Sequence, residues 1–255
     1  MSRALQRREN IAGYLFMLPS LIFFIGFVVI PMVICIGYGF TDANMNSKTA
    51  ATTFVGLRNF IDLWQDTTFL LALKNTFLIV VVSVPTVCLF SLWVGSAIYH
   101  LKGPVLSAFR CIFYLPVVTG SVAVTVVWKW MYDNYTGILN YVLKGAGLIE
   151  ENINFLGDER FALWCIILIL FTTSVGQPIV LYVSALGNVD TTLIEAAQVD
   201  GANDIQVFWK VKWPQMMPTT LYILVITTIN SFQCFALIQL LTQGGSGTNT
   251  VMYYI

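Results

Sequence analysis

Residues 161–189 read FALWCIILILFTTSVGQPIVLYVSALGNV, without a single Asp, Glu, Lys or Arg. Four more stretches are equally free of these charges, at 10–41, 75–101, 111–128 and 213–255. A helix needs about 20 apolar residues to cross a hydrocarbon core about 30 Å thick. The runs are long and do not alternate between apolar and polar residues, so they predict membrane-spanning helices rather than the strands of a barrel.

The composition of the whole chain agrees with a membrane protein. Hydrophobic residues make up 57% of it and charged residues only 10%, whereas soluble domains carry about 25% charged residues. The formal net charge is zero and no run of Lys or Arg occurs, so we expect no nucleic-acid partner. The five cysteines are scattered through apolar stretches without a C-x-x-C pair, which predicts small buried side chains and no metal site.

These runs predict an all-α polytopic membrane protein with five spanning helices. The expected helices cover about 12–39, 75–99, 109–131, 161–187 and 219–242. The runs also divide the chain into an amino terminus (1–11), a first transmembrane helix (12–39), an outer segment (40–74) and a core (75–255). Because Arg3, Arg7 and Arg8 precede the first helix, and basic residues favour the cytoplasmic side, we expect a cytoplasmic amino terminus and an extracytoplasmic 40–74.

A polar segment separates the fourth apolar run from the fifth. Its Thr192-x-x-Glu195 pattern is typical of a capping box, in which the hydroxyl and the carboxylate bond free amides at the start of a helix. Gly201 follows where a helix would end in a left-handed residue. Asn203-x-x-Gln206 starts a second short helix, and Pro214 and Pro218, which lack an amide hydrogen, are expected to end it. The alternative is a plain connecting loop folded on itself.

The same segment resembles the EAA loop of ABC-importer membrane subunits. The resemblance rests on Glu195-Ala196-Ala197, on Gly201 and on Val211-x-Trp213-Pro214, with valine and tryptophan where the family pattern has isoleucine and leucine. Further motifs are similar to binding-protein-dependent sugar permeases of the maltose/glycerol-phosphate type: Phe54-Val55-Gly56-Leu57-x-Asn59-Phe60, Leu73-Lys74-Asn75-Thr76, Phe113-Tyr114-Leu115-Pro116 and Leu240-Leu241-Thr242-x-Gly244-Gly245. We name residues 188–218 the EAA loop.

The resemblance implies the type I permease bundle of ABC importers, a multi-pass protein of the plasma or inner membrane of a prokaryote. The family has six core helices where five are predicted here. We therefore expect a sixth helix to be missing from the carboxyl end, so that the chain is truncated or partial after Ile255.

The resemblance also implies the partners and the mechanism. Two permease subunits, usually non-identical, enclose a pathway that opens by alternating access, driven by two ATP-binding subunits and supplied by an extracytoplasmic solute-binding protein. The implied ATPase-coupling residues are Glu195, Ala196, Ala197, Asp200, Gly201 and Pro214. We expect no catalytic residue and no cofactor in this chain, since no glycine is followed by lysine as a GxxxxGK[ST] phosphate loop requires. ATP and Mg would be bound by the partner ATPase.

Polar residues inside the runs are the candidates for solute contact, because such groups are expensive in lipid and face the bundle interior. After the EAA loop, the polar cluster contains the candidates Thr227, Asn230, Ser231 and Cys234. Placed against the maltose-type permeases, Thr227, Ser231 and Cys234 fall where that family contacts sugar, and Ser174 and Gln177 before the loop match a similar pair. Gly176 and Pro178 beside the last pair predict a locally opened helix. The resemblance implies a sugar or oligosaccharide as the solute. Packing between helices is the alternative role for each residue.

Other function classes are less consistent with the sequence. A membrane enzyme needs a buried titratable pair, and none is recognisable inside the runs. A passive channel or a scaffold has no use for an EAA loop. A permease of the same fold for glycerol phosphate, an amino acid or phosphate stays open as the alternative, and a charged solute would predict a charged residue in mid-span.

Overall fold

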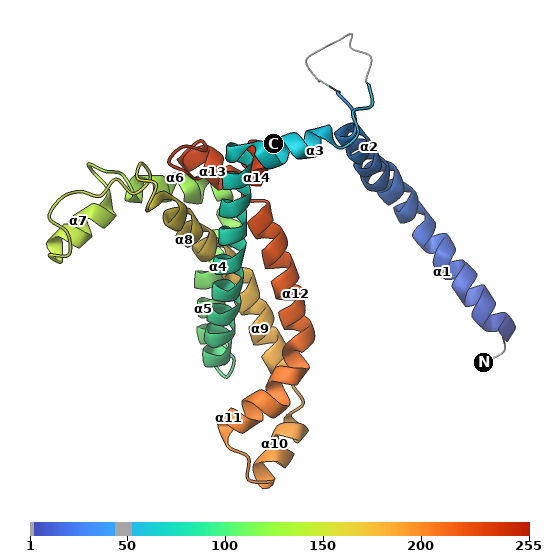
Figure 1. The fold of residues 1–255 in the computed structure, drawn as a ribbon. Coiled ribbons are helices and arrows are strands. Elements are labelled where there is room, and N and C mark those ends of the chain that lie inside the picture. Colours follow the sequence, from blue (N-terminus) through green and yellow to red (C-terminus); the bar gives the residue numbers. More distant parts are fainter. Residues whose placement is uncertain (1–2, 44–52) are drawn as a thin grey trace. The chain divides into compact units, whose positions relative to one another are not determined.

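The computed structural model describes residues 3–43 and 53–255. These residues form helices, with one isolated β-bridge between Thr41 and Phe54. The chain divides into two units, Met1–Thr67 and Thr68–Ile255 (Figure 1). Residues 1–2 of the predicted amino terminus and 44–52 of the predicted outer segment lie outside the described residues.

The first unit contains one long apolar helix. α1 (Arg3–Phe24) continues through a π-helical turn, η1 (Ile25–Val29), into α2 (Ile30–Gly39), which confirms a helix over the predicted 12–39. The mean hydropathy within Ile11–Gly39 reaches 2.7, and none of that window is buried. A helix that is apolar on every side and uncovered by its own unit suits a lipid environment.

The motif at residues 54–60 closes the end of α2. Asn59 donates hydrogen bonds from Nδ2 to the carbonyl oxygens of Gly39 (3.0 Å) and Thr41 (2.9 Å). Carbonyls at a helix end have no partner inside the helix, so these bonds satisfy them. Phe60 packs on Phe40, with ring centroids 5.3 Å apart. Asn59 and Phe60 belong to α3 (Arg58–Gln65), which is thereby fixed to the end of α2.

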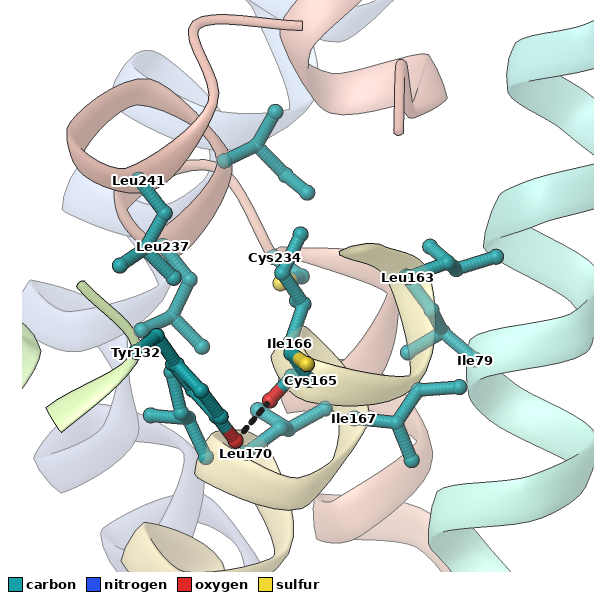
Figure 2. Packing of buried hydrophobic residues seen from close by; sticks show 12 residues of the cluster. Ile79, Tyr132, Leu163, Cys165, Ile166, Ile167, Leu170, Cys234, Leu237 and Leu241 are labelled. Atoms are coloured by element: carbon teal, nitrogen blue, oxygen red, sulfur yellow. Dashed lines mark hydrogen bonds between the residues drawn. The ribbon is translucent and has the colours of Figure 1, made fainter. Parts of the chain in front are cut away.

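α4 (Thr67–Ile98) is the central helix of the second unit and begins earlier than the predicted residue 75. Its buried side chains join three apolar clusters. The first connects it to α8 (Ala162–Ser174) and α13 (Ala236–Leu241), as Figure 2 shows around Ile79. The others connect it to α9 (Gly176–Gly187) and α12 (Trp213–Phe232). In lipid, close packing rather than the exclusion of water stabilises such contacts.

The prediction of one helix over 109–131 is wrong. α5 (Pro104–Val118) and α6 (Ser121–Met131) meet at an angle of 92°. Gly120 turns the chain with φ of +79°, a conformation that glycine adopts without strain. Just before it, the Thr119 hydroxyl donates to the Leu115 carbonyl (2.7 Å) at the end of α5. With 15 residues, α5 is about 22 Å long.

α8 and α9 form a second bent pair, with an angle of 40° between them. The bend lies at Val175, directly before Gly176, which confirms the opening predicted there. Gly176 also touches α5, since a Cβ atom at this position would collide with the Phe113 carbonyl and lie 3.0 Å from Val117 Cγ2. α9 therefore approaches α5 at a point that only glycine allows.

The last predicted helix, 219–242, begins earlier and is interrupted. α12 already begins at Trp213, and residues 233–235 separate it from α13. α13 packs against α6, and Tyr132 after α6 donates its hydroxyl to the Cys165 carbonyl at 3.4 Å (Figure 2). The described residues contain three helices that are long and apolar enough to cross a membrane, or five if each bent pair is one span. The predicted number matches the second count.

Two sequence motifs that are far apart along the chain meet at one end of the bundle. Asn75 on α4 donates from Nδ2 to the carbonyl oxygens of Gly247 (2.7 Å) and Asn249 (2.8 Å). The neighbouring Thr76 hydroxyl accepts from the amide of Val251 (3.0 Å), the first residue of α14 (Val251–Tyr254). A single turn of α4 therefore fixes the glycine-rich turn that follows α13.

Asn75→Asp is expected to lower the free energy of unfolding by about 2–4 kcal/mol. The substitution keeps the size of the side chain but removes both N–H donors, and a carboxylate would face two carbonyl oxygens. Thermal unfolding of the purified protein in detergent measures the loss. Asn188→Asp, at an exposed position after α9, is the matched control. An equal loss in both variants would show that the two hydrogen bonds contribute nothing specific.

The segment between α6 and α8 contains a further short helix, α7 (Ile138–Gly145). The Asn140 side chain fixes it, because Nδ2 donates to the Ile153 carbonyl and Oδ1 accepts from the Ile153 amide, both at 3.0 Å. α7 projects beside the end of the bundle that carries α13 and α14 (Figure 1).

Candidate functional site: the EAA loop and the polar cavities

The EAA loop forms a helical hairpin at one end of the second unit. It contains α10 (Thr191–Val199), α11 (Asp204–Val207) and a π-helical turn, η2 (Phe208–Lys212), which runs directly into α12. Figure 1 shows α10 and α11 at one end of this unit and α13 and α14 at the other. The hairpin is therefore continuous with a helix that runs the length of the bundle.

Asp190, not Thr192, caps the first helix of the loop. Its Oδ1 accepts hydrogen bonds from the hydroxyl (2.7 Å) and the amide (2.9 Å) of Thr192. These two bonds lower the pKa of the Asp190 carboxyl below its ordinary value, so the cap is ionised at neutral pH. The predicted capping box of Thr192 and Glu195 is wrong, because Thr192 lies inside the helix as the donor and Glu195 lies exposed one turn further on.

Gly201 ends this helix in a left-handed conformation as predicted, with φ of +82°. The Gly201 amide donates to the Gln198 carbonyl (3.0 Å), and the Ala202 amide donates to the Ala197 carbonyl (2.9 Å). This pair of bonds is a Schellman motif, which satisfies the last carbonyls of a helix. The spacing between Ala197 and Gly201 therefore has a backbone cause that is independent of any partner.

The second short helix begins as predicted. The Gln206 amide donates to Asn203 Oδ1 (2.8 Å), and the Asn203 amide donates to Gln206 Oε1 (2.9 Å), which completes a capping box. The prediction that Pro214 and Pro218 end this helix is wrong, since Pro214 lies in the first turn of α12 and Pro218 inside it. The helix continues because η2 shifts the hydrogen-bond register, and Pro214 then falls where an amide is not required.

Three aromatic side chains pack together where η2 joins α12. The ring centroids of Trp209 lie 5.4 Å from Phe208 and 5.5 Å from Trp213, and Phe208 and Trp213 are 6.5 Å apart. Contacts between aromatic rings at these distances are favourable. Trp213, which departs from the family pattern, therefore has ring neighbours on its own helix.

The predicted ATPase-coupling residues lie mostly on the outside of the hairpin. Ala197 is half-buried, and the others are exposed: Glu195, Ala196, Asp200, Gly201 and Pro214. The same hairpin exposes four larger apolar side chains, Leu193, Val199, Ile205 and Trp209. Single exposed apolar residues are ordinary, and these four give one short hairpin an apolar surface.

The predicted solute residues on α12 lie in two environments. Thr227 and Ser231 are on the buried face of the helix, with 4% and 2% of their surfaces exposed, in line with the fully buried Ile223. Packing against the other helices of this chain accounts for that face. Asn230, one residue before Ser231, is exposed instead. Solute contact by Thr227 and Ser231 stays a prediction.

Asn230 and Cys234 meet in a cavity of about 260 Å³. Its wall also contains Ser121 from the start of α6, Thr173 from α8, and Gln233. Sequence reasoning missed Ser121 and Thr173 as contacts. The signal for Ser121 is Gly120, because only the bend at this glycine brings α6 over the cavity. The polar groups of this wall are uncharged, which suits a neutral ligand that forms hydrogen bonds.

Gln177 faces a different hollow, a groove of about 420 Å³ between α5 and α9 that Arg110 and Tyr114 also line. Ser174 is half-buried at the end of α8. The structure therefore brings Asn230 and Cys234 together and places Gln177 apart from them.

Comparison with known proteins gives the family. Residues 72–253 match the family described as "Binding-protein-dependent transport system inner membrane component". The chain is 33% identical over 252 residues to the "Probable ABC transporter permease protein YesP" of Bacillus subtilis (strain 168), a match that covers 97% of this chain and 79% of YesP. It is 29% identical to the "Lactose transport system permease protein LacF" of Rhizobium radiobacter, over 99% of this chain and 84% of LacF.

A solved structure shares the fold. The crystal structure of a bacterial alginate ABC transporter in complex with an alginate pentasaccharide-bound periplasmic protein contains a chain that is 24% identical to this one, with a TM-score of 0.74. The likeness covers 97% of this chain and 82% of that chain and establishes the type I permease fold. The chain therefore belongs to the binding-protein-dependent transport system inner membrane components, as a non-catalytic, multi-pass permease subunit of an ABC importer in the inner membrane.

Proposed function

We propose that this permease carries a sugar or oligosaccharide into the cell by alternating access, driven by ATP hydrolysis in partner subunits. The chain forms half of the pathway and a second, non-identical permease forms the other half. An extracytoplasmic solute-binding protein delivers the solute at the end that carries α13 and α14. The amino terminus and the EAA loop are then cytoplasmic, in agreement with Arg3, Arg7 and Arg8 ahead of the first apolar run.

The exposed hairpin is the observation that carries this proposal. Its two helices close their ends with their own hydrogen bonds, at Asp190, Gly201 and Asn203, yet Leu193, Val199 and Ile205 on these helices are exposed. A preformed apolar surface suits docking into a cleft, because little conformational entropy is lost on binding. We assign contact with the ATPase to Glu195, Ala196, Ala197, Asp200, Gly201 and Pro214. ATP and Mg²⁺ are bound by that partner.

The uncharged polar wall beside α12 supports a sugar as the solute. Asn230 and Gln233 offer amide groups, Thr173 and Ser121 offer hydroxyl groups, and Cys234 adds a thiol. Sugars present many hydroxyl groups, and neutral amides both donate to and accept from them. The name of the relative LacF, a lactose transport permease, points to the same solute class. Glycerol phosphate, an amino acid or phosphate is the alternative for a permease of this fold.

Reconstituted transport tests the proposal. The solute-binding protein is first screened by thermal shift against mono- and oligosaccharides, glycerol phosphate, amino acids and phosphate. The complete importer in proteoliposomes is then given the labelled ligand, with Mg-ATP or Mg-ADP on the side of the EAA loop. We expect a sugar to accumulate with ATP and not with ADP. Equilibration without ATP would instead indicate a channel, and an amino acid or phosphate as the ligand would contradict the sugar.

A further inference from the structure

The EAA loop touches α4 through one long polar side chain. Lys212, the last residue of η2, donates a hydrogen bond from Nζ to the Tyr99 hydroxyl at 2.5 Å. The same Nζ lies 5.0 Å from the centroid of the Tyr99 ring. Tyr99 follows directly after the last residue of α4, and both side chains are half-buried. The contact joins two positions that are 113 residues apart in the chain.

Lys212 and Lys210 differ in their surroundings although both lie on η2. Lys210 lies on the same π-helical turn, but it is exposed, as a lysine on a hydrated loop ordinarily is. Lys212 instead holds its flexible side chain against the Tyr99 hydroxyl, at a cost in conformational entropy that the hydrogen bond offsets. The His100 ring, with its centroid 3.9 Å from that of Tyr99, limits the freedom of the phenol.

α4 is the helix that connects this contact to the far end of the bundle. Near its other end, Asn75 holds the turn at residues 247–249 through two hydrogen bonds. Between these ends, Gly95 approaches α9 so closely that an added Cβ atom would lie 2.9 Å from Tyr182 Cβ. The contact at Tyr99, the close approach of Gly95 to α9 and the hydrogen bonds of Asn75 therefore lie along one continuous helix.

We propose that the Lys212–Tyr99 contact is a second transmission point, through which the EAA loop moves α4 in addition to α12. This inference rests on the proposed function, because it assumes that ATP binding in a partner displaces the hairpin. Lys212 is then a positioning residue. It leaves ATP hydrolysis and the solute cavity untouched, and it determines how much of the motion of the hairpin reaches α4.

Hydrogen exchange on the complete importer tests the contact without any solute. In the wild type, a non-hydrolysable ATP analogue with Mg²⁺ is expected to change amide exchange both in the EAA loop and in residues 95–103, where the Tyr99 and Leu101 amides are hydrogen-bonded at 3.0 Å. Lys212→Met should keep the response of the EAA loop and lose that of residues 95–103. Lys212→Arg should restore it, and the control Lys210→Met should behave as the wild type.

The possible outcomes distinguish a failure of the proposed function from a failure of the Lys212–Tyr99 transmission point. If nucleotide leaves the EAA loop unchanged in the wild type, the proposed function fails and the transmission point fails with it. Two results would overturn only the transmission point, provided that the EAA loop responds to nucleotide. In one, residues 95–103 respond equally in the wild type and in Lys212→Met. In the other, residues 95–103 respond in neither protein. If Lys210→Met also lost the response of residues 95–103, the loss of a positive charge on η2 would be the cause rather than the contact with Tyr99. That result would overturn the transmission point as well.

Transport provides a second readout that a purely structural role would not alter. We expect Lys212→Met to hydrolyse ATP at the wild-type rate but to import solute about fivefold more slowly, so that more ATP is consumed per solute. Tyr99→Phe, which keeps the ring and loses the hydroxyl that accepts the bond, should import solute as slowly as Lys212→Met. A parallel fall in hydrolysis and import, with a lower melting temperature, would show that the contact only stabilises the fold.

Discussion

Gly176→Val is expected to prevent the correct packing of α9 on α5 and to lower the free energy of unfolding by about 3 kcal/mol or more. Any Cβ atom at this position collides with the carbonyl of Phe113, and Val117 also lies within reach of it. The Phe113 carbonyl belongs to the backbone of α5, so it cannot rotate away as a flexible side chain can. Thermal unfolding in detergent and the yield of monodisperse protein measure the effect.

Gly187→Ala is the matched control on the same helix. It lies at the end of α9, is exposed, and has no heavy atom within 4 Å of an added Cβ atom. The expected change is between zero and a gain of about 1 kcal/mol, because alanine restricts the unfolded chain more than glycine does. Losses of similar size at both positions would contradict the close approach of α9 and α5.

Gly201→Val is expected to reduce ATP-dependent uptake about tenfold or more while the bundle stays folded. An added Cβ atom would meet nothing within 4 Å, so the effect does not come from a clash. It comes from φ of +82°, which costs an ordinary L-residue about 1–2 kcal/mol and a β-branched residue more. The Schellman turn would open, and the hairpin would lose the shape with which we propose it docks.

Gly201→Asn separates the backbone effect from the loss of glycine itself. Asparagine tolerates the left-handed region, so Gly201→Asn should keep most of the wild-type uptake. Its melting temperature should equal that of Gly201→Val, because the bundle stays folded in both variants. Uptake in proteoliposomes and binding of the purified ATPase to the permease are the two measurements. If Asn and Val abolished uptake equally, the surface at residue 201 rather than the turn would be the cause.

Local chemistry made the turns of the EAA loop predictable. The left-handed Gly201 and the capping box of Asn203 and Gln206 depend only on residues within a few positions of each other. The start of the first helix was predicted incorrectly because Asp190 and Thr192 are both good cap residues. The choice between them depends on the direction from which α9 arrives, and a pattern of single residues does not contain that direction.

Hydropathy located the apolar runs but not their path. Residues 111–128 are free of acidic and basic side chains throughout, so their hydropathy gives no sign of the 92° change of direction at Gly120. Which side of α12 is buried was equally hard to predict from the sequence. The resemblance selected Thr227 and Ser231, but whether their side of α12 faces the interior of the bundle depends on how α12 packs on α4 and α9.

The self-closed hydrogen bonding of the hairpin has a consequence for how the transporter is put together. Because α10 and α11 complete their own backbone bonds at Asp190, Gly201 and Asn203, they need no companion to acquire their shape. If the hairpin docks on the ATPase as we propose, we expect the two proteins to meet as rigid bodies, without folding upon contact. The proposal then predicts that the permease can enter the membrane either before or after the ATPase subunits are present, since docking requires no folding step.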